Sequence, residues 1–351
     1  MIHLGIVGCN YGRTVHLPAF RLDPRCDVIA LAGTDGARTT ELAREAGVRF
    51  GLGEWQALID HRDVDAVAIA TPPTLQPEIA LRALAQGKPV FVEKPLAADL
   101  AGAATMVAAA RTSRRPAMVD FQFAEIAAWQ RAKELLDTGA IGRLRHVVVT
   151  WNVESMATRL RLKSWKTSRR AGGGALGNLV SHCFYYLEWF CGPLAGLSAR
   201  LFGRPQADEP DEENTVALAL AFGSGAGGSL EVSNAAYIGS GHRLEFYGDE
   251  GTIALVNQTA DYMRGFELLY ARRPAQALSR LVLEDPDDHH FADGRILPVA
   301  RLASRFLDAI EGGGAASPSF SDGYRVQQLI DASRRSHDLG RWIDVASEAL
   351  A

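Results

Sequence analysis

The sequence predicts a two-domain α/β protein: a parallel sheet wound with helices on both faces, followed by an α+β domain on a large, mostly antiparallel open sheet. Short apolar runs alternate with amphipathic segments through the first third of the chain, as in successive βαβ units. Beyond residue 120, β-branched runs of alternating polarity are typical of a sheet with one solvated face. A length of 351 residues is sufficient for both domains.

We expect the first domain over residues 1–120. Its strands are expected at 2–7, 27–32, 66–70, 89–92 and 117–119, and its main helices at 38–46, 77–86 and 100–111. Gly47 and Gly87 each follow a helix at the position where glycine commonly ends one. This alternation of strands and helices predicts a parallel sheet.

The second domain is expected over residues 121–351 and is predicted to bind substrate and to form the oligomer. A helix at 127–137 is followed by predicted strands at 145–152, 195–202, 215–222, 227–233, 242–248 and 251–256. Closing helices are expected at 301–311 and 322–339, the last of which can pack back on the first domain. Two acid-rich segments, 205–214 and 283–294, are predicted to be solvated loops.

Composition excludes several kinds of partner. A net charge of -4 and a pI near 6.2 give no general attraction to nucleic acid or to an anionic membrane. The longest apolar runs are shorter than the ~20 residues that a membrane span requires, and the N-terminus lacks the pattern of a signal peptide. We therefore expect no nucleic acid and no membrane partner.

Cysteine and histidine spacing predicts no metal site. The four cysteines, Cys9, Cys26, Cys183 and Cys191, show neither zinc-type pairing nor a disulfide pattern, which fits a reducing cytoplasm. His289 and His290 follow two aspartates, but adjacent ligands in an acidic loop lack a spaced partner.

The loop after the first predicted strand is the strongest sign of dinucleotide binding. A dinucleotide fold needs glycine there, because the chain turns sharply and its backbone approaches the pyrophosphate. Asn10 replaces the second glycine of the usual G-x-G-x-x-G motif, and we expect it to tolerate left-handed backbone geometry. The candidate cofactor residues in this loop are Gly8, Asn10, Tyr11, Gly12 and Arg13.

The end of the second strand bears on the choice between NAD and NADP. An acidic residue at this position accepts hydrogen bonds from the ribose hydroxyl of NAD, but here the position is Gly33. Thr34 and Arg38 can meet the extra phosphate of NADP, whereas Asp35 is near enough to reverse the preference. Arg38 can equally be an ordinary solvated helix residue. We predict bound NAD(P), with NADP slightly preferred.

Two further strand ends are expected to border the cofactor, because doubly wound folds bind ligands at the carboxyl ends of their strands. Thr71 and Pro72 follow one strand, and Glu93 and Lys94 follow the next. A lysine there can donate to a substrate oxygen and stabilise its negative charge.

In combination, these segments resemble the Gfo/Idh/MocA family of oxidoreductases, the glucose-fructose oxidoreductase and inositol dehydrogenase type. The segments that carry the resemblance are the loop 8–12 with His16, Leu17, Pro18 and Ala19, the turn 70–73, Glu93-Lys94-Pro95, the glycine-rich run 172–176 with His182, and 323–342. The resemblance spans nearly the whole chain.

The resemblance implies a Rossmann domain, bound NAD(P), and hydride transfer at a hydroxyl or ketone carbon of a sugar, nucleotide sugar or cyclitol. Position by position, Lys94 matches the family's catalytic lysine and His182 its histidine. Asn178 stands where an aspartate is usual, and Tyr185 replaces a second common aspartate. The resemblance therefore makes Lys94, His182 and Asn178 the catalytic candidates.

The substrate is expected to contact Lys94, Asn178, His182, Tyr185 and Trp165. Trp151 and Trp165 are candidate aromatic platforms for a sugar, and core packing is the alternative for each. A homodimer or homotetramer is predicted, because alternating apolar side chains on the predicted sheet need cover on both faces or a partner: Val147, Val149, Leu218 and Leu220. The resemblance implies that the association is sheet to sheet.

Three functions fit these observations. The first is an NAD(P)-dependent dehydrogenase or reductase acting on CH-OH groups of a small carbohydrate or cyclitol. The second is a glycoside-cleaving enzyme of the same fold that retains NAD and recycles its hydride. The third is a non-catalytic sensor or scaffold that binds dinucleotide, an alternative suggested by Asn178 and opposed by the retained Lys94 and His182.

Overall fold

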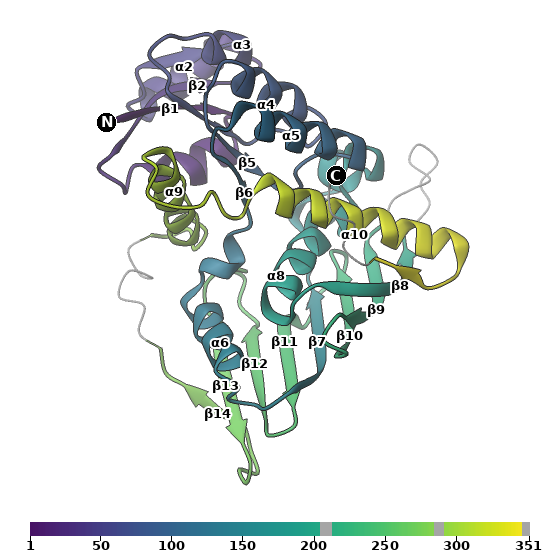
Figure 1. The fold of residues 1–351 in the computed structure, drawn as a ribbon. Coiled ribbons are helices and arrows are strands. Elements are labelled where there is room, and N and C mark those ends of the chain that lie inside the picture. The colour runs from purple at the N-terminus through teal and green to yellow at the C-terminus, as the bar shows by residue number, and fades with distance from the viewer. Residues whose placement is uncertain (204–212, 284–290, 346–351) are drawn as a thin grey trace. The chain divides into compact units, whose positions relative to one another are not determined.

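The computed structural model describes residues 1–203, 213–283 and 291–345 (Figure 1). Most of the two predicted acidic loops, including the run from Asp287 to His290, lies outside the described residues. The chain divides into one unit of Met1–Gln122 with Phe291–Gln327, and another of Phe123–His290 with Gln328–Ala351. The sequence had suggested that every residue after 120 belongs to one domain, whereas the structure groups residues 291–327 with the first 122.

The first unit contains a six-stranded parallel sheet in the order β3-β2-β1-β4-β5-β6. Its strands are β1 (Ile2–Val7), β2 (Cys26–Ala32), β3 (Phe50–Leu52), β4 (Ala66–Ile69), β5 (Val90–Glu93) and β6 (Ala117–Asp120). Apart from the short edge strand β3, whose residues are half-buried, they are almost wholly buried, as strands covered by helices on both faces must be. The predicted doubly wound class is confirmed for this unit.

The helices of this unit follow the strands in the expected alternation. They are η1 (Gly12–His16), α1 (Leu17–Phe20), α2 (Gly36–Glu45), α3 (Trp55–Ile59), α4 (Gln76–Ala85), α5 (Leu100–Ser113) and α9 (Ile296–Ile310). The first turn, η1, is π-helical, a form that often marks functional positions. Asp35 and Asp99 begin α2 and α5 by accepting backbone N–H groups with their carboxylates.

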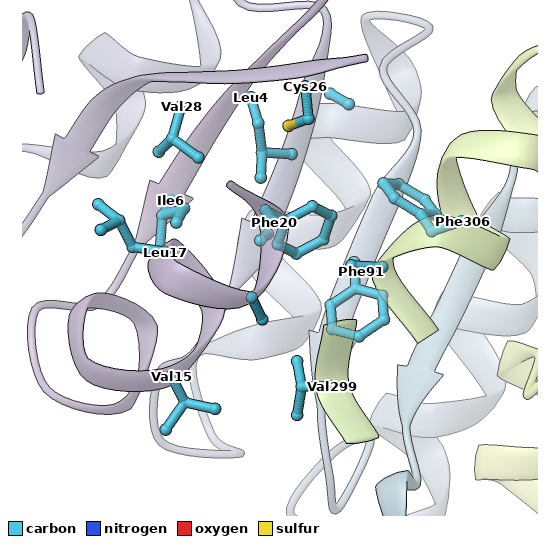
Figure 2. Close-up of a cluster of buried hydrophobic side chains, with 14 of the residues drawn as sticks. Leu4, Ile6, Val15, Leu17, Phe20, Cys26, Val28, Phe91, Val299 and Phe306 are labelled. Carbon is cyan, nitrogen blue, oxygen red and sulfur yellow. The ribbon is translucent and has the colours of Figure 1, made fainter. Parts of the chain in front are cut away.

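One hydrophobic core joins the N-terminal strands to α9, which lies almost 300 residues later in the chain (Figure 2). The rings of Phe20 and Phe91 meet edge to face with centroids 5.4 Å apart, and Phe306 of α9 lies 5.8 Å from Phe91. Burial of three aromatic rings favours this packing by several kcal/mol. Helix α9 therefore belongs to the first unit.

The second unit contains a nine-stranded sheet in the order β14-β13-β12-β11-β7-β10-β9-β8-β15 (Figure 1). Its strands are β7 (Leu144–Asn152), β8 (Leu194–Phe202), β9 (Thr215–Phe222), β10 (Gly227–Ser233), β11 (Gly241–Gly248), β12 (Gly251–Asn257), β13 (Glu267–Arg272), β14 (Ser279–Leu281) and β15 (Ile343–Asp344). Among the strands of this sheet that the structure describes, only β7 and β10 pair in parallel. The predicted mostly antiparallel sheet is confirmed.

The remaining helical segments follow β6 in the chain, and the first of them begins at Gln122. They are η2 (Gln122–Glu125), α6 (Ala127–Asp137), α7 (Met156–Arg159), η3 (Trp165–Thr167), η4 (Arg169–Ala171), η5 (Leu176–Val180), α8 (Ser181–Cys191) and α10 (Phe320–Leu339). None of the described helices is long and apolar enough to cross a membrane.

One face of this sheet, the one that carries Val147, Val149, Leu218 and Leu220, is covered by other parts of the chain. Val147, Val149, Leu218 and Leu220 are each at most 5% exposed. Of the two sources of cover that the sequence left open, packing within the chain and a partner subunit, the first accounts for these four side chains.

Candidate nucleotide site and catalytic residues

The loop after β1 requires glycine at two positions. Gly8 has a φ of 117°, and a Cβ there would lie 2.3 Å from the carbonyl oxygen of Ala70. A Cβ at Gly12 would lie 2.7 Å from the side chain of Ile6. These contacts keep the loop backbone close to the carboxyl edge of the sheet, where a pyrophosphate binds in this kind of fold.

Asn10 does not adopt the left-handed conformation that we expected. The non-glycine residues with positive φ in the described structure are Arg114, Arg161 and Ile238. Instead, the carbonyl oxygen of Asn10 accepts a hydrogen bond from the backbone N–H of Thr14 at 3.0 Å. The chain enters a helical turn directly after Asn10, so this position needs no glycine.

The buried polar atoms without a hydrogen-bond partner in the described structure include Nε of Arg13 and Oγ1 of Thr71, which belong to the loops after β1 and β4. Buried polar atoms are nearly always satisfied in native proteins, so unsatisfied ones need an explanation. The two atoms, together with the glycine positions, fit the polar groups of a dinucleotide. The adjacent Pro72 is exposed.

At the end of β2, the side chain of Asp35 is engaged within its own helix. One carboxylate oxygen accepts the backbone N–H of Arg38 at 3.0 Å. The guanidinium of Arg38 forms an exposed ion pair with Glu41, and Thr34 is exposed as well. A Cβ at Gly33 would lie 2.5 Å from Oγ1 of Thr39 and 2.8 Å from Sγ of Cys9, so a larger side chain at the position of the missing carboxylate would have to displace one of these side chains.

The turn that carries Lys94 is held by a residue that was not among the candidates from sequence. Gln76, fully buried at the start of α4, donates its side-chain amide to the carbonyl oxygens of Glu93, Pro95 and Leu96 at 3.0, 2.8 and 3.1 Å. A buried amide that contacts three carbonyls fixes the backbone on both sides of Lys94.

A second unexpected feature is a buried cluster of His16, Glu93 and Asp120. Glu93 and Asp120 are in register on adjacent strands, and Nε2 of His16 lies 3.1 Å from Oε1 of Glu93 and 3.3 Å from Oδ2 of Asp120. Burial alone lowers the pKa of His16, but the hydrogen bonds to Asp120 and Glu93 raise it to about 9. Burial and the charge of Glu93 raise the pKa of Asp120 to about 8. The cluster therefore holds protons at neutral pH.

In the second unit, a glycine-rich segment fixes the residues around Trp165. A Cβ at Gly173 would lie 1.9 Å from the carbonyl oxygen of Trp165, and one at Gly177 would lie 2.0 Å from that of Gly172. Such backbone contacts allow only glycine. They set the position of half-buried Trp165 relative to η5, the π-helical turn that contains Asn178.

His182 lies on α8, four residues after Asn178. Its side chain is 4% exposed and packs edge to face on Phe123, with ring centroids 4.9 Å apart. Asn178 and Tyr185 are half-buried. All three catalytic or substrate candidates on this helical segment therefore belong to one short stretch of the second unit.

Trp151 and Tyr186 belong to the aromatic core beneath α8. Trp151 is 2% exposed and stacks on His242, with ring centroids 4.3 Å apart, so core packing accounts for this tryptophan. The hydroxyl of Tyr186 lies 3.0 Å from Nε2 of His242, and burial lowers the pKa of His242 to about 3. His242 is therefore neutral and serves the core.

Comparison with known proteins gives the family. Residues 2–121 match the oxidoreductase family model with an NAD-binding Rossmann fold, and residues 129–254 match the GFO/IDH/MocA C-terminal domain. An uncharacterised oxidoreductase of Synechocystis is 31% identical over 97% of this chain and 95% of its own.

A levoglucosan dehydrogenase of Pseudarthrobacter phenanthrenivorans is 28% identical over 98% of both chains. A solved levoglucosan dehydrogenase in complex with NADH and levoglucosan superposes with a TM-score of 0.88 at 26% identity, covering 99% of this chain and 100% of the other. Since the two family models match in the expected order and the relatives match over almost the full length, this chain belongs to the GFO/IDH/MocA family of NAD-binding oxidoreductases.

Proposed function

We propose that the protein transfers a hydride between NAD(P) and a hydroxyl or ketone carbon of a sugar, nucleotide sugar or cyclitol. The observation that carries the proposal is the fixed turn of Lys94. In a chain with an NAD-binding fold, a lysine directly follows β5, and the amide of Gln76 holds the backbone around it. The similarity to a levoglucosan dehydrogenase supports a carbohydrate substrate.

In this proposal, His182 and Lys94 both act on the substrate oxygen but have different roles. A bound nicotinamide ring supplies or accepts the hydride. The imidazole of His182 takes the proton from the substrate hydroxyl during oxidation and returns it during reduction, because imidazole is the side chain best suited to proton transfer near neutrality. The ammonium group of Lys94 donates to the same oxygen and stabilises the negative charge that develops there.

Asn178, Tyr185 and Trp165 complete the proposed substrate site. Asn178 can hydrogen-bond to a sugar hydroxyl or to His182 but brings no charge, so it favours the protonated imidazole less than a carboxylate would. Trp165 provides an apolar face for a sugar ring. Tyr185 supplies a hydroxyl that can donate or accept.

We further propose a modest preference for NADP(H). Two features support it: Gly33 leaves no carboxylate at the end of β2, and the carboxylate of Asp35 already accepts the N–H of Arg38. Arg38 must leave Glu41 to meet the extra phosphate, which keeps the preference small. Tighter binding of NADH than NADPH in parallel fluorescence titrations would overturn this assignment.

A homodimer or homotetramer formed through the sheet of the second unit also stays a proposal, now on different grounds. The outer face of the sheet carries the small, part-exposed side chains of Ala217, Ala219, Ala221 and Ser229 on adjacent strands. Small side chains on adjacent strands suit sheet-to-sheet packing, although the same face also carries the charged Glu231 opposite Ala217. A monomer mass by light scattering at micromolar concentration would contradict it.

The predicted cytoplasmic location is tested by subcellular fractionation.

The function is tested by incubating the protein with sugars, anhydrosugars, cyclitols and nucleotide sugars in the presence of NAD or NADP. A dehydrogenase yields a ketone or lactone together with one equivalent of reduced nucleotide. The glycoside-cleaving alternative yields a cleaved sugar with no net reduced nucleotide, so mass spectrometry of the product separates the two. Dinucleotide binding without any product would support the sensor alternative.

A further inference from the structure

The cluster of His16, Glu93 and Asp120 connects three elements of the first unit. His16 ends η1, the turn that follows the nucleotide loop, while Glu93 ends β5 and Asp120 ends β6. Their side chains are 0% to 11% exposed, and the single Nε2 of His16 faces both carboxylates. Two adjacent carboxylates in such a site repel each other unless a shared proton or a cation lies between them.

A protonated imidazole meets that requirement. The three ligand atoms lie within 4.8 Å of one another, which a metal would also need. In the described structure, Nε2 lies within hydrogen-bonding distance of both carboxylate oxygens, so one proton on Nε2 links the three side chains directly. The raised pKa of His16 agrees with a charged imidazolium.

The same histidine touches the nucleotide loop. The ring of Tyr11 packs edge to face on His16 with centroids 5.2 Å apart, and the guanidinium carbon of Arg295 lies 5.2 Å from the Tyr11 ring. The hydroxyl of Tyr11 accepts a hydrogen bond of 3.3 Å from the amide of Gln122, two residues after Asp120. A shift of Tyr11 therefore acts on His16 through direct contact.

The cluster is also linked to Lys94, because Glu93 directly precedes Lys94 in the chain. Phe20 and Phe91 pack around the His16 ring with centroids 6.4 and 5.3 Å away. The charged or titratable groups facing His16 are therefore Glu93, Asp120 and the phenol of Tyr11. With this packing, Glu93 cannot lose its partner without moving or taking up a proton.

We propose that His16 is a positioning residue that couples the nucleotide loop to Lys94. By holding Glu93 and Asp120 together, the imidazolium fixes the ends of β5 and β6, while its ring supports Tyr11. The inference rests on the proposed function for the role of Lys94. The coupling between His16, the loop and the lysine is measurable without turnover.

The test uses His16→Gln, which keeps an amide donor near the position of Nε2 but removes the positive charge. The chain contains five lysines, at 88, 94, 133, 163 and 166, so reductive ¹³C-methylation gives few dimethyl-lysine NMR signals. Lys94→Arg assigns the signal of Lys94. In spectra recorded above pH 7, we expect His16→Gln to shift the signal of Lys94. We also expect the Kd of this variant for NADH, measured by fluorescence titration, to be severalfold higher than that of the wild type.

A second substitution separates charge from packing. In His16→Gln/Asp120→Asn, only one carboxylate remains, so the Lys94 signal and the Kd should return at least halfway to their wild-type values. His61→Gln, a half-buried histidine elsewhere in the first unit, is the control and should change neither. Far-ultraviolet circular dichroism checks that each variant is folded. If His16→Gln does not fold, the single variant Asp120→Asn is used to test the proposal. Asp120→Asn keeps the imidazolium with Glu93 and should stay within about threefold of the wild-type Kd.

An unchanged Lys94 signal and Kd in folded His16→Gln would overturn the proposal, as would the absence of any recovery in the double variant. If His16→Gln fails to fold, a Kd raised more than tenfold in Asp120→Asn would overturn it. If the wild-type protein converts no sugar or cyclitol, the proposed function fails instead, while the NMR and binding measurements still decide whether His16 is coupled to Lys94.

Discussion

The side-chain amide of Gln76 donates a hydrogen bond of 2.8 Å to the carbonyl oxygen of Pro95, immediately after Lys94. The same amide also contacts the carbonyl oxygens of Glu93 and Leu96. The position of the proposed catalytic lysine therefore depends on a side chain from a different strand–helix connection. A lysine at a strand end is otherwise free to move with its loop.

Replacing this amide is expected to destabilise the protein. Gln76→Leu keeps the volume but leaves buried carbonyl oxygens without a donor, which costs about 1–3 kcal/mol. Urea denaturation at pH 7 measures the loss. Gln86→Leu is the control, because Gln86 donates to Asp60 at the surface. Equal denaturation midpoints for the two variants would contradict the structural role of Gln76.

Substitution of Gly8 is expected to abolish dinucleotide binding. Gly8→Ala combines a positive φ with a Cβ only 2.3 Å from a backbone oxygen, so the loop must shift. Gly139→Ala is the matched control, since Gly139 also has a positive φ but no atom within 4 Å of the added Cβ. Calorimetric titration with NADH should detect no binding for Gly8→Ala and wild-type affinity for Gly139→Ala. Normal binding by both would show that the loop does not contact the nucleotide.

The cluster of His16 and Asp120 predicts that stability falls as pH rises. Their pKa values in the folded protein are raised to about 9 and about 8, so between pH 6.5 and 9 the folded state binds more protons than the unfolded chain. The stabilisation by His16 is fully present below its unfolded pKa and is lost as pH approaches 9. The urea midpoint should decrease from pH 6 to pH 9. The corresponding free energy of unfolding should fall by more than about 1 kcal/mol.

The double variant His16→Gln/Asp120→Asn provides the control for this pH dependence. It lacks both groups with raised pKa values, so its urea midpoint should vary less over the same range. A wild-type midpoint that stays constant or rises from pH 6.5 to 9 would show that the cluster does not hold its protons at neutral pH.

Asn178→Asp is expected to change the pH dependence of turnover. A carboxylate four residues before His182 favours the protonated imidazole, so the limb of the rate profile that depends on this group should move upward, by up to about one pH unit. Profiles of kcat/KM for oxidation measure it. Asn178→Ser, which adds no charge, should leave the limb in place. A downward shift for Asn178→Asp would be inconsistent with proton transfer by His182.

Much of the fold could be predicted from local patterns, and the exceptions have physical causes. The five strands predicted in the first domain have apolar runs bounded by glycine or proline, whereas β3, Phe50–Leu52, is too short to show a pattern. The parallel pairing of β7 with β10 and the packing of α9 against Phe20 depend on contacts between distant parts of the chain. No window of sequence contains such contacts.

The candidate site divides in the same way. Glycines and the Glu93-Lys94-Pro95 turn are visible because each has a local backbone reason. The cluster of His16, Glu93 and Asp120 is not, since its members lie 77 and 104 residues from the histidine. The motif containing His16 is visible in the sequence, but a buried histidine is identified as paired only once the register of β5 and β6 is known.

The central claim, hydride transfer with Lys94 and His182 at the substrate oxygen, is tested most directly by single-turnover kinetics at saturating NAD(P). With a substrate identified among the sugars and cyclitols, His182→Ala and Lys94→Ala should each slow hydride transfer by ~10²- to 10⁴-fold, typical of lost acid–base or electrostatic catalysis. The Kd of His182→Ala for the dinucleotide should change little. Near-wild-type rates of transfer for either variant would contradict the proposed mechanism.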